Sequence, residues 1–118
     1  MGHKKYPFQR VIYETASAGT NTLKDDRIES GYLYCYQRVA VLNKTNPFTR
    51  SRVIVSGAGL DFISSEQHNP NADVLYWDDV PLYVSEGNQL QAELTGCSAS
   101  DELFMYVTGW LQRSLEVE

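Results

Sequence analysis

Few side chains in this sequence could take part in catalysis, and they lie far apart. The chain has two histidines, His3 near its start and His68 within the polar run at residues 65–73. A Ser-His-Asp or Cys-His site needs a nucleophile beside a base, and neither histidine adjoins such a motif. The Gly-x-Ser-x-Gly nucleophile turn is absent as well. The sequence therefore predicts a protein without catalytic residues, which is not an enzyme.

Metal and phosphate sites have equally little support. Structural zinc sites use four ligands, whereas the chain has only two cysteines and two histidines, all widely separated. Asp78 and Asp79 are adjacent, but the spacing of the nearby carboxylates fits no calcium loop. The Gly-Ala-Gly run at residues 57–59 is followed by neither a helix signal nor a third glycine. We expect no metal, no cofactor, and free thiols at Cys35 and Cys97.

Aromatic side chains are a better clue to a binding surface. In the run at residues 32–43, Leu33, Cys35, Val39 and Val41 are expected on one strand face, with the tyrosines and Arg38 on the other. The run at residues 103–107 has apolar side chains on both faces, which requires cover on both sides. These rings form either the second half of a core or a contact between subunits. The candidate interface residues are Tyr6, Phe8, Tyr13, Tyr32, Tyr34 and Tyr36.

A carbohydrate-binding platform is the alternative use of the aromatic residues. Tyr76, Trp77 and Trp110 would form an exposed stacking surface, with Asp78 and Asp79 nearby. Aromatic rings that present an apolar face and a polar rim suit such a contact.

Composition restricts the class of protein. The chain has 118 residues, 42% of them hydrophobic and 21% charged, which is enough for one domain with its own core. Its net charge of −5 disfavours nucleic acid as a partner, because nucleic-acid binding requires a basic face. No apolar run approaches the ~20 residues that span a bilayer. We therefore expect neither a nucleic-acid partner nor a membrane partner.

Charge is unevenly divided along the chain. Residues 1–59 hold nine Lys or Arg and four Asp or Glu, a net charge of +5. Residues 60–118 hold one basic residue and eleven acidic residues, a net charge of −10, and the two halves together give −5. Either strands from the two halves interleave and neutralise each other, or the surface is bipolar and attracts copies of itself or unlike neighbours.

The hydrophobic pattern predicts an all-β protein. Leu90, Ala92 and Leu94 alternate with polar residues after the Glu-Gly-Asn turn at 86–88, the period of a strand with one buried face. Residues 16–31 and 65–73 are predicted as polar loops, with a short helical turn at 23–30 as the alternative within the first. The run at 101–115 is predicted as a strand, with a helix as the alternative. Seven or eight short strands predict a single antiparallel β-sandwich or jelly roll. The other predicted strands are residues 6–15, 32–43, 50–56 with a continuation at 60–64, 74–77 and 80–84.

Four stretches together resemble the small β-sandwich or jelly-roll structural proteins of tailed bacteriophages, such as capsid decoration (cement) proteins and head-spike proteins. They are the tyrosine-alternating run at residues 31–46, the valine-rich run at 52–57, the hairpin with its alternating strand at 82–96, and the aromatic run at 101–111. The resemblance lies in the succession of strands and turns, and it implies no catalytic residues.

The resemblance implies a non-enzymatic virion structural protein that is assembled in the host cytoplasm. Its expected partners are copies of itself, in a homo-oligomer, and capsid or connector subunits. Residues 1–30 would then be an N-terminal strand and extended arm that reaches a neighbour, and residues 31–118 the sandwich body of one domain. The alternative function is a carbohydrate-binding or receptor-binding β-sandwich module.

Overall fold

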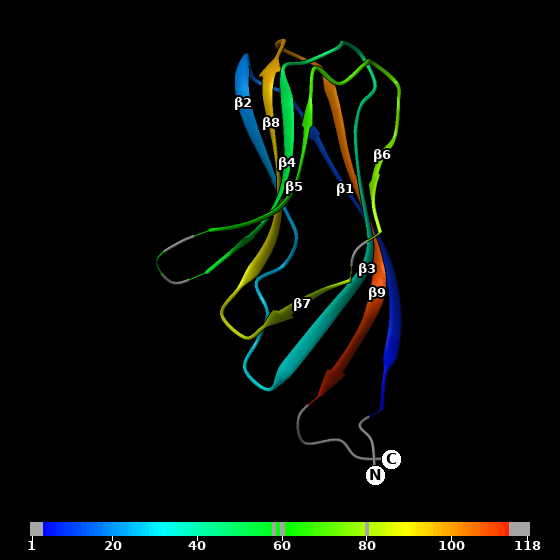
Figure 1. The fold of residues 1–118 in the computed structure, drawn as a ribbon, viewed down its shortest axis with the longest axis vertical. Helices are drawn as coiled ribbons and strands as arrows, with labels where there is room; N and C mark the ends of the chain where they lie inside the picture. The colour runs from blue at the N-terminus through cyan, green and yellow to red at the C-terminus, as the bar shows by residue number, and fades with distance from the viewer. Residues whose placement is uncertain (1–3, 58, 60, 80, 114–118) are drawn as a thin grey trace.

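The protein is a sandwich of two antiparallel β-sheets, as seen in a computed structural model that describes residues 4–57, 59, 61–79 and 81–113 (Figure 1). The predicted fold class is therefore confirmed. No helix occurs among the described residues. This part of the chain therefore holds no helix that is long and apolar enough to cross a membrane.

Within the described residues, nine strands make up the two sheets. The five-stranded sheet has the order β1-β9-β3-β6, with β7 also paired to β3, and the four-stranded sheet has the order β2-β8-β4-β5. The strands are β1 (Tyr6–Thr15), β2 (Gly19–Lys24), β3 (Tyr32–Asn43), β4 (Arg50–Ser56), β5 (Phe62–His68), β6 (Tyr76–Asp78), β7 (Leu82–Ser85), β8 (Gln89–Cys97) and β9 (Glu102–Arg113).

Two segments that were predicted as loops contain strands. β2 lies within residues 16–31, and β5 includes the first part of the polar run at 65–73, as far as His68. Both are edge strands whose side chains are largely exposed, so their sequences lack the hydrophobic alternation on which the prediction relied. The run predicted as a strand or a helix is a strand, β9, as far as it is described.

The N-terminal segment is part of the sandwich and is not a separate arm. β1 pairs with β9 along its whole length, from Tyr6 opposite Leu111 to Thr15 opposite Glu102. β2 pairs with β8. The predicted division at residue 30 is therefore wrong for residues 6–24, because their backbone hydrogen bonds complete both sheets.

Every pair of neighbouring strands joins the basic half of the sequence to the acidic half. β1 to β4 come from residues 1–59 and β5 to β9 from residues 60–118, and the two groups alternate across both sheets. Ion pairs between neighbouring strands follow this pattern: Arg52 pairs with Glu66 at 2.5 Å and Arg50 with Glu93 at 3.4 Å. Interleaving with charge neutralisation, the first of the two alternatives, is what the structure shows.

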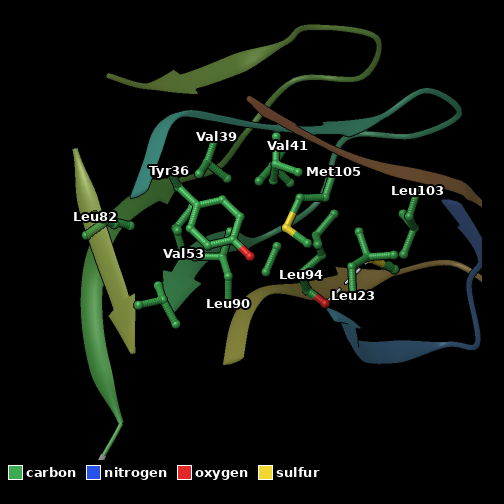
Figure 2. Close-up of a cluster of buried hydrophobic side chains, with 14 of the residues drawn as sticks. Leu23, Tyr36, Val39, Val41, Val53, Leu82, Leu90, Leu94, Leu103 and Met105 are labelled. Carbon is green, nitrogen blue, oxygen red and sulfur yellow. Dashed lines mark hydrogen bonds between the residues drawn. The ribbon is translucent and has the colours of Figure 1, made fainter. Parts of the chain in front are cut away.

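The core lies between the facing sides of the two sheets (Figure 2). The predicted alternation in β8 is confirmed, because Leu90, Ala92 and Leu94 are fully buried. Leu103 and Met105 of β9 meet them from the opposite sheet. Cys35 and Cys97 are both buried free thiols, as predicted.

A β-bulge in the middle of β3 changes which of its side chains face the core. Tyr36 pairs with Gly109 and Arg38 with Thr108, which leaves Gln37 as the extra residue. The tyrosines before the bulge therefore share the inner face with Val39 and Val41, whereas Leu33 and Cys35 share the outer face with Arg38. The predicted division of this strand into two faces is wrong, because it assumed unbroken alternation.

Gly109 lies directly against the backbone of β3. A Cβ at this position would overlap the carbonyl oxygen of Cys35 and would approach the Cα of Tyr36 to 3.1 Å. Only glycine fits here, so the bulge and this glycine form a single local structure.

A buried charge cluster links the two sheets. Arg10 of β1 donates to the carboxylate of Asp25 through Nε at 3.0 Å and Nη2 at 2.5 Å. The hydroxyl of Tyr36 in β3 donates to the same carboxylate at 2.5 Å. Asp25 follows β2 and extends the pairing with β8, since its N–H donates to the carbonyl of Leu90. Burial, together with the hydrogen bond and charge of Asp25, raises the pKa of Tyr36.

We expect Gly109→Ala to destabilise the protein by about 1–3 kcal/mol or more, because the new methyl group overlaps the backbone of β3. Urea denaturation measures the effect. Gly19→Ala is the control: Gly19 has a φ of 99° but open space around it, so only backbone strain of about 1–2 kcal/mol applies. If the Gly109 variant is as stable as the native protein, the close approach is misassigned.

We expect Tyr36→Phe to lower the free energy of unfolding at neutral pH by about 1.5–3 kcal/mol, because it removes a hydrogen bond to a carboxylate.

Because the pKa of Tyr36 is raised in the folded protein, the stability of the native protein also depends on pH in the alkaline range. An unfolded tyrosine ionises near pH ~10 while the folded one stays neutral, so native stability falls as the pH rises above ~10.

Denaturation at pH values on either side of the tyrosine pKa tests this expectation. The loss of stability should be smaller in Tyr36→Phe than in the native protein. Tyr13→Phe removes a hydroxyl from a half-exposed ring and should change little. Equal alkaline losses in the native protein and in Tyr36→Phe would rule out this role for Tyr36.

Candidate binding face

The outer face of the five-stranded sheet, turned away from the four-stranded sheet, exposes aromatic side chains. In β9 the residues at 103, 105 and 107 are buried, so Phe104, Tyr106, Thr108 and Trp110 point outward. Their neighbours on the other strands share this face, because residues paired across a ladder lie on the same side. We call the following residues the aromatic face: Tyr13, Trp77, Tyr83, Phe104, Tyr106 and Trp110.

The rings stand in rows that cross the strands. Tyr106 and Trp77 belong to one row, since both residues pair with Ala40 of β3. Trp110 and Tyr83 belong to another, since both pair with Cys35. Trp77 is 51% exposed and Tyr83 is 63% exposed, so these rings are available to a ligand.

An open groove of about 730 Å³ lies between these two rows. It runs at the level of the β3 bulge, and Gly109 is part of its lining. A second hollow of about 450 Å³ shares Gln37, Arg38 and Thr108 with the groove and adds Asp79. The residues that line the groove are Pro7, Phe8, Gln9, Gln37, Arg38, Trp77, Thr108 and Gly109.

Arg38 connects the polar and aromatic parts of the groove. Its Nε donates to Asp79 at 2.8 Å, and its guanidinium carbon lies 5.3 Å from the centre of a Trp77 ring. Both charged side chains are more than half exposed, so the ion pair adds little to stability. Its effect is to hold hydrogen-bonding groups beside an exposed indole.

The second row is held by contacts around Trp110. Its ring lies edge-on to Tyr83 with 6.3 Å between centres, and Lys5 Nζ lies 4.5 Å from the ring centre. Cys35 sits between the two aromatic residues in the ladder, and burial raises the pKa of its thiol. Cys35 is therefore a packing residue of this face.

The structure brings together two of the three residues predicted as a carbohydrate platform. Trp77 and Trp110 lie on the same face, on opposite sides of the groove. Tyr76 points to the other side of β6, where its hydroxyl accepts a hydrogen bond from the N–H of Asn71 at 2.7 Å. Of the two nearby aspartates, Asp79 lines the adjoining hollow, whereas Asp78 accepts a hydrogen bond from Ser64.

The predicted interface tyrosines do not form one exposed surface. Tyr36 is fully buried, so it cannot contact another subunit. Tyr32 and Tyr34 are half-buried at the end of the inner face, where they line a separate hollow of about 540 Å³ with the loop after β2. Phe8 packs on Tyr34 with 5.4 Å between ring centres.

Tyr6 and Tyr13 complete this set of predicted residues. Tyr6 lies on the inner face at the start of β1 and near Arg113, whose guanidinium carbon is 5.6 Å from the ring. Tyr13 is the one member of the set on the aromatic face, where its ring lies 5.0 Å from that of Phe104.

Sequence reasoning missed several residues of the aromatic face and of the groove. Tyr83 lies between two buried residues of β7, and that alternation was available as a signal that its side chain points outward. Gln9 and Thr108 alternate with buried or half-buried residues in the same way. Gln37 and Arg38 could not be placed, because the bulge that directs them depends on a partner strand far away in the sequence.

The chemistry of the groove is that of recognition. Exposed indole and phenol rings offer flat apolar surfaces, and the amides, hydroxyl and guanidinium of the floor offer hydrogen bonds in several directions. Among the described residues, no group of three or more His, Cys, Asp or Glu side chains could hold a metal ion.

Comparisons with known proteins add little to this geometry. No protein-family model and no curated protein matches the chain. A mutant of a family 29 carbohydrate-binding module is similar with a TM-score of 0.43 and 10% identity, over 96% of this chain and 76% of that one. An exo-beta-1,3-galactanase from Phanerochaete chrysosporium, solved with galactose, is similar with a TM-score of 0.40 and 14% identity, over 91% of this chain and 29% of that one. At these TM-scores and identities, neither similarity bears on function.

Proposed function

We propose that the protein is a carbohydrate-binding β-sandwich module and that the groove on the aromatic face is its binding site. The observation that supports this most strongly is the groove itself: a polar floor between two rows of rings, with half of the Trp77 surface exposed. Sugars present apolar C–H patches and hydroxyl groups together, so a site for them combines flat rings with polar groups.

The ring of Trp77 and the polar residues of the floor make different contacts with the ligand. Trp77 stacks on the apolar face of one sugar ring, which removes apolar surface of both partners from water. Gln9, Gln37 and Thr108 exchange hydrogen bonds with hydroxyl groups. Arg38 donates to Asp79 through Nε, and its remaining N–H groups can donate to sugar hydroxyls.

Fluorescence reports directly on this site, because both tryptophans of the chain belong to the aromatic face. We expect soluble plant and microbial polysaccharides to include one that changes the tryptophan emission on titration. Trp77→Ala should weaken its binding at least about tenfold, equivalent to about 1.4 kcal/mol. The structure should be unaffected, because the indole is exposed.

Tyr13→Ala is the matched control. Tyr13 is a half-exposed ring on the same face but beyond the groove, so its loss should leave glycan affinity unchanged. If Trp77→Ala and Tyr13→Ala bind a glycan equally well, the groove is not the site. If no polysaccharide binds the native protein, the proposed function is wrong.

A contact between subunits is the second candidate function. Tyr13 and Val11 are 50% and 57% exposed and adjoin Phe104 and Tyr106 at the end of the aromatic face away from Trp110. Phe104 and Tyr106 stack with 6.0 Å between centres. A contiguous apolar patch of this kind favours burial against another protein, which would suit the predicted homo-oligomer and, through it, the predicted virion role.

Light scattering of the purified protein tests the second candidate. A monomer has a mass of 13.4 kDa, and an oligomer built on this patch should dissociate in Val11→Glu, which places a charge at its centre. The same variant should retain glycan binding. A native monomer at all concentrations would exclude a stable homo-oligomer.

A further inference from the structure

The groove crosses the full width of the five-stranded sheet. Its lining includes Gln9 from β1, Thr108 from β9, Arg38 from β3 and Trp77 from β6, which follow the strand order from one edge to the other. Neighbouring strands lie about 4.8 Å apart, so the first and last of these strands are separated by about 14 Å. This distance exceeds the span of one pyranose ring.

Both ends of the groove reach an edge of the sheet. β1 and β6 are the terminal strands in the order of this sheet, and no described strand continues it beyond either of them. A ligand that lies in the groove can therefore extend past both edges.

Along the strands, the groove lies at the level of Thr108, between the levels of Tyr106 and Trp110 on β9. Tyr106 and Trp110 are four residues apart on β9, with Thr108 of the floor between them. At a strand rise of about 3.3 Å per residue, the two rows are about 13 Å apart. That width admits one glycan chain, which would contact Trp77 where it lines the groove.

The floor has little net charge. Its direct lining holds the amides of Gln9 and Gln37 and the hydroxyl of Thr108, and the one cationic group, Arg38, is paired with Asp79 at 2.8 Å. Amides and hydroxyls match sugar hydroxyls, which both donate and accept.

We propose that the ligand is an internal segment of an extended, uncharged polysaccharide that lies across the strands from β1 to β6. This inference rests on the proposed function and adds to it the ligand class and its direction. A site for a chain end would need a wall that closes the groove, and the described residues place exposed side chains at both of its ends.

Isothermal titration calorimetry with oligosaccharides of increasing length tests the proposal. The probes are the monosaccharide to hexasaccharide series of cellulose, mannan, xylan and galactan, together with the parent polymers. For the glycan that binds, affinity should rise at least about tenfold from monosaccharide to hexasaccharide and then level off. Borohydride reduction of the chain end should not change the affinity, and several protein molecules should bind each polymer chain.

Variants at the two ends of the groove test whether the polysaccharide lies across the strands from β1 to β6. Gln9→Ala at the β1 end and Trp77→Ala at the β6 end should each weaken hexasaccharide binding. Gln112→Ala, which removes another glutamine from β9 outside the groove lining, is the control and should bind as the native protein does.

The outcomes separate the inference from the function on which it rests. Equal affinity for monosaccharide and hexasaccharide, loss of binding on end reduction, or unchanged hexasaccharide binding by Gln9→Ala would overturn the inference while leaving a carbohydrate-binding module. Failure of every polymer to bind would overturn the proposed function and the inference with it.

Discussion

The pairing of β3 with β9 is the contact on which the rest of the structure depends. It runs from Tyr32 opposite Arg113 to Asn43 opposite Leu103, down the middle of the five-stranded sheet. β1 adds to the free side of β9, and β6 and β7 add to the free side of β3. One face of this pair supplies half of the core (Figure 2), and the other supplies Trp110 and the floor of the groove. The bulge at Gln37 and the close approach at Gly109 therefore affect both packing and the binding face.

The cluster of Arg10, Asp25 and Tyr36 fixes how the two sheets face each other. Asp25 is 4% exposed and belongs to the four-stranded sheet, whereas its two side-chain partners belong to the other one. The side chain of Gln89 also donates to the carbonyl of Asp25 at 2.7 Å. A charge buried at this depth is tolerated only with partners of this kind, and the loss of one partner leaves the others unsatisfied. The cluster thus favours one relative placement of the sheets over alternatives with similar hydrophobic contact.

The uneven charge of the sequence has a structural explanation. Since each strand of the basic half pairs only with strands of the acidic half, the +5 and −10 of the two halves are mixed over both sheets. Exposed ion pairs add little stability individually, but like charges on neighbouring strands would be unfavourable, so the arrangement disfavours pairing within one half. On the aromatic face, Arg38 of the basic half pairs with Asp79 of the acidic half. The other polar groups of the groove are uncharged amides and a hydroxyl.

The sequence by itself determined the local features of this protein. Alternation in β8, the turn before it and the β-rich runs of β3, β4 and β9 were sufficient for an all-β sandwich, because strand periodicity is a property of consecutive residues. The indoles of Trp77 and Trp110 were recognisable as surface candidates from their residue type, because aromatic rings suit a binding contact.

Only the tertiary structure decided which side chains meet. β1 and β9 come from opposite ends of the chain, and nothing local specifies that they pair or in which register. The bulge at Gln37 turned the tyrosines of β3 inward, and strand pairing placed Trp77, Tyr83 and Trp110 around one groove. A binding face on a sheet is assembled across strands, so its composition depends on long-range pairing that a single sequence does not display.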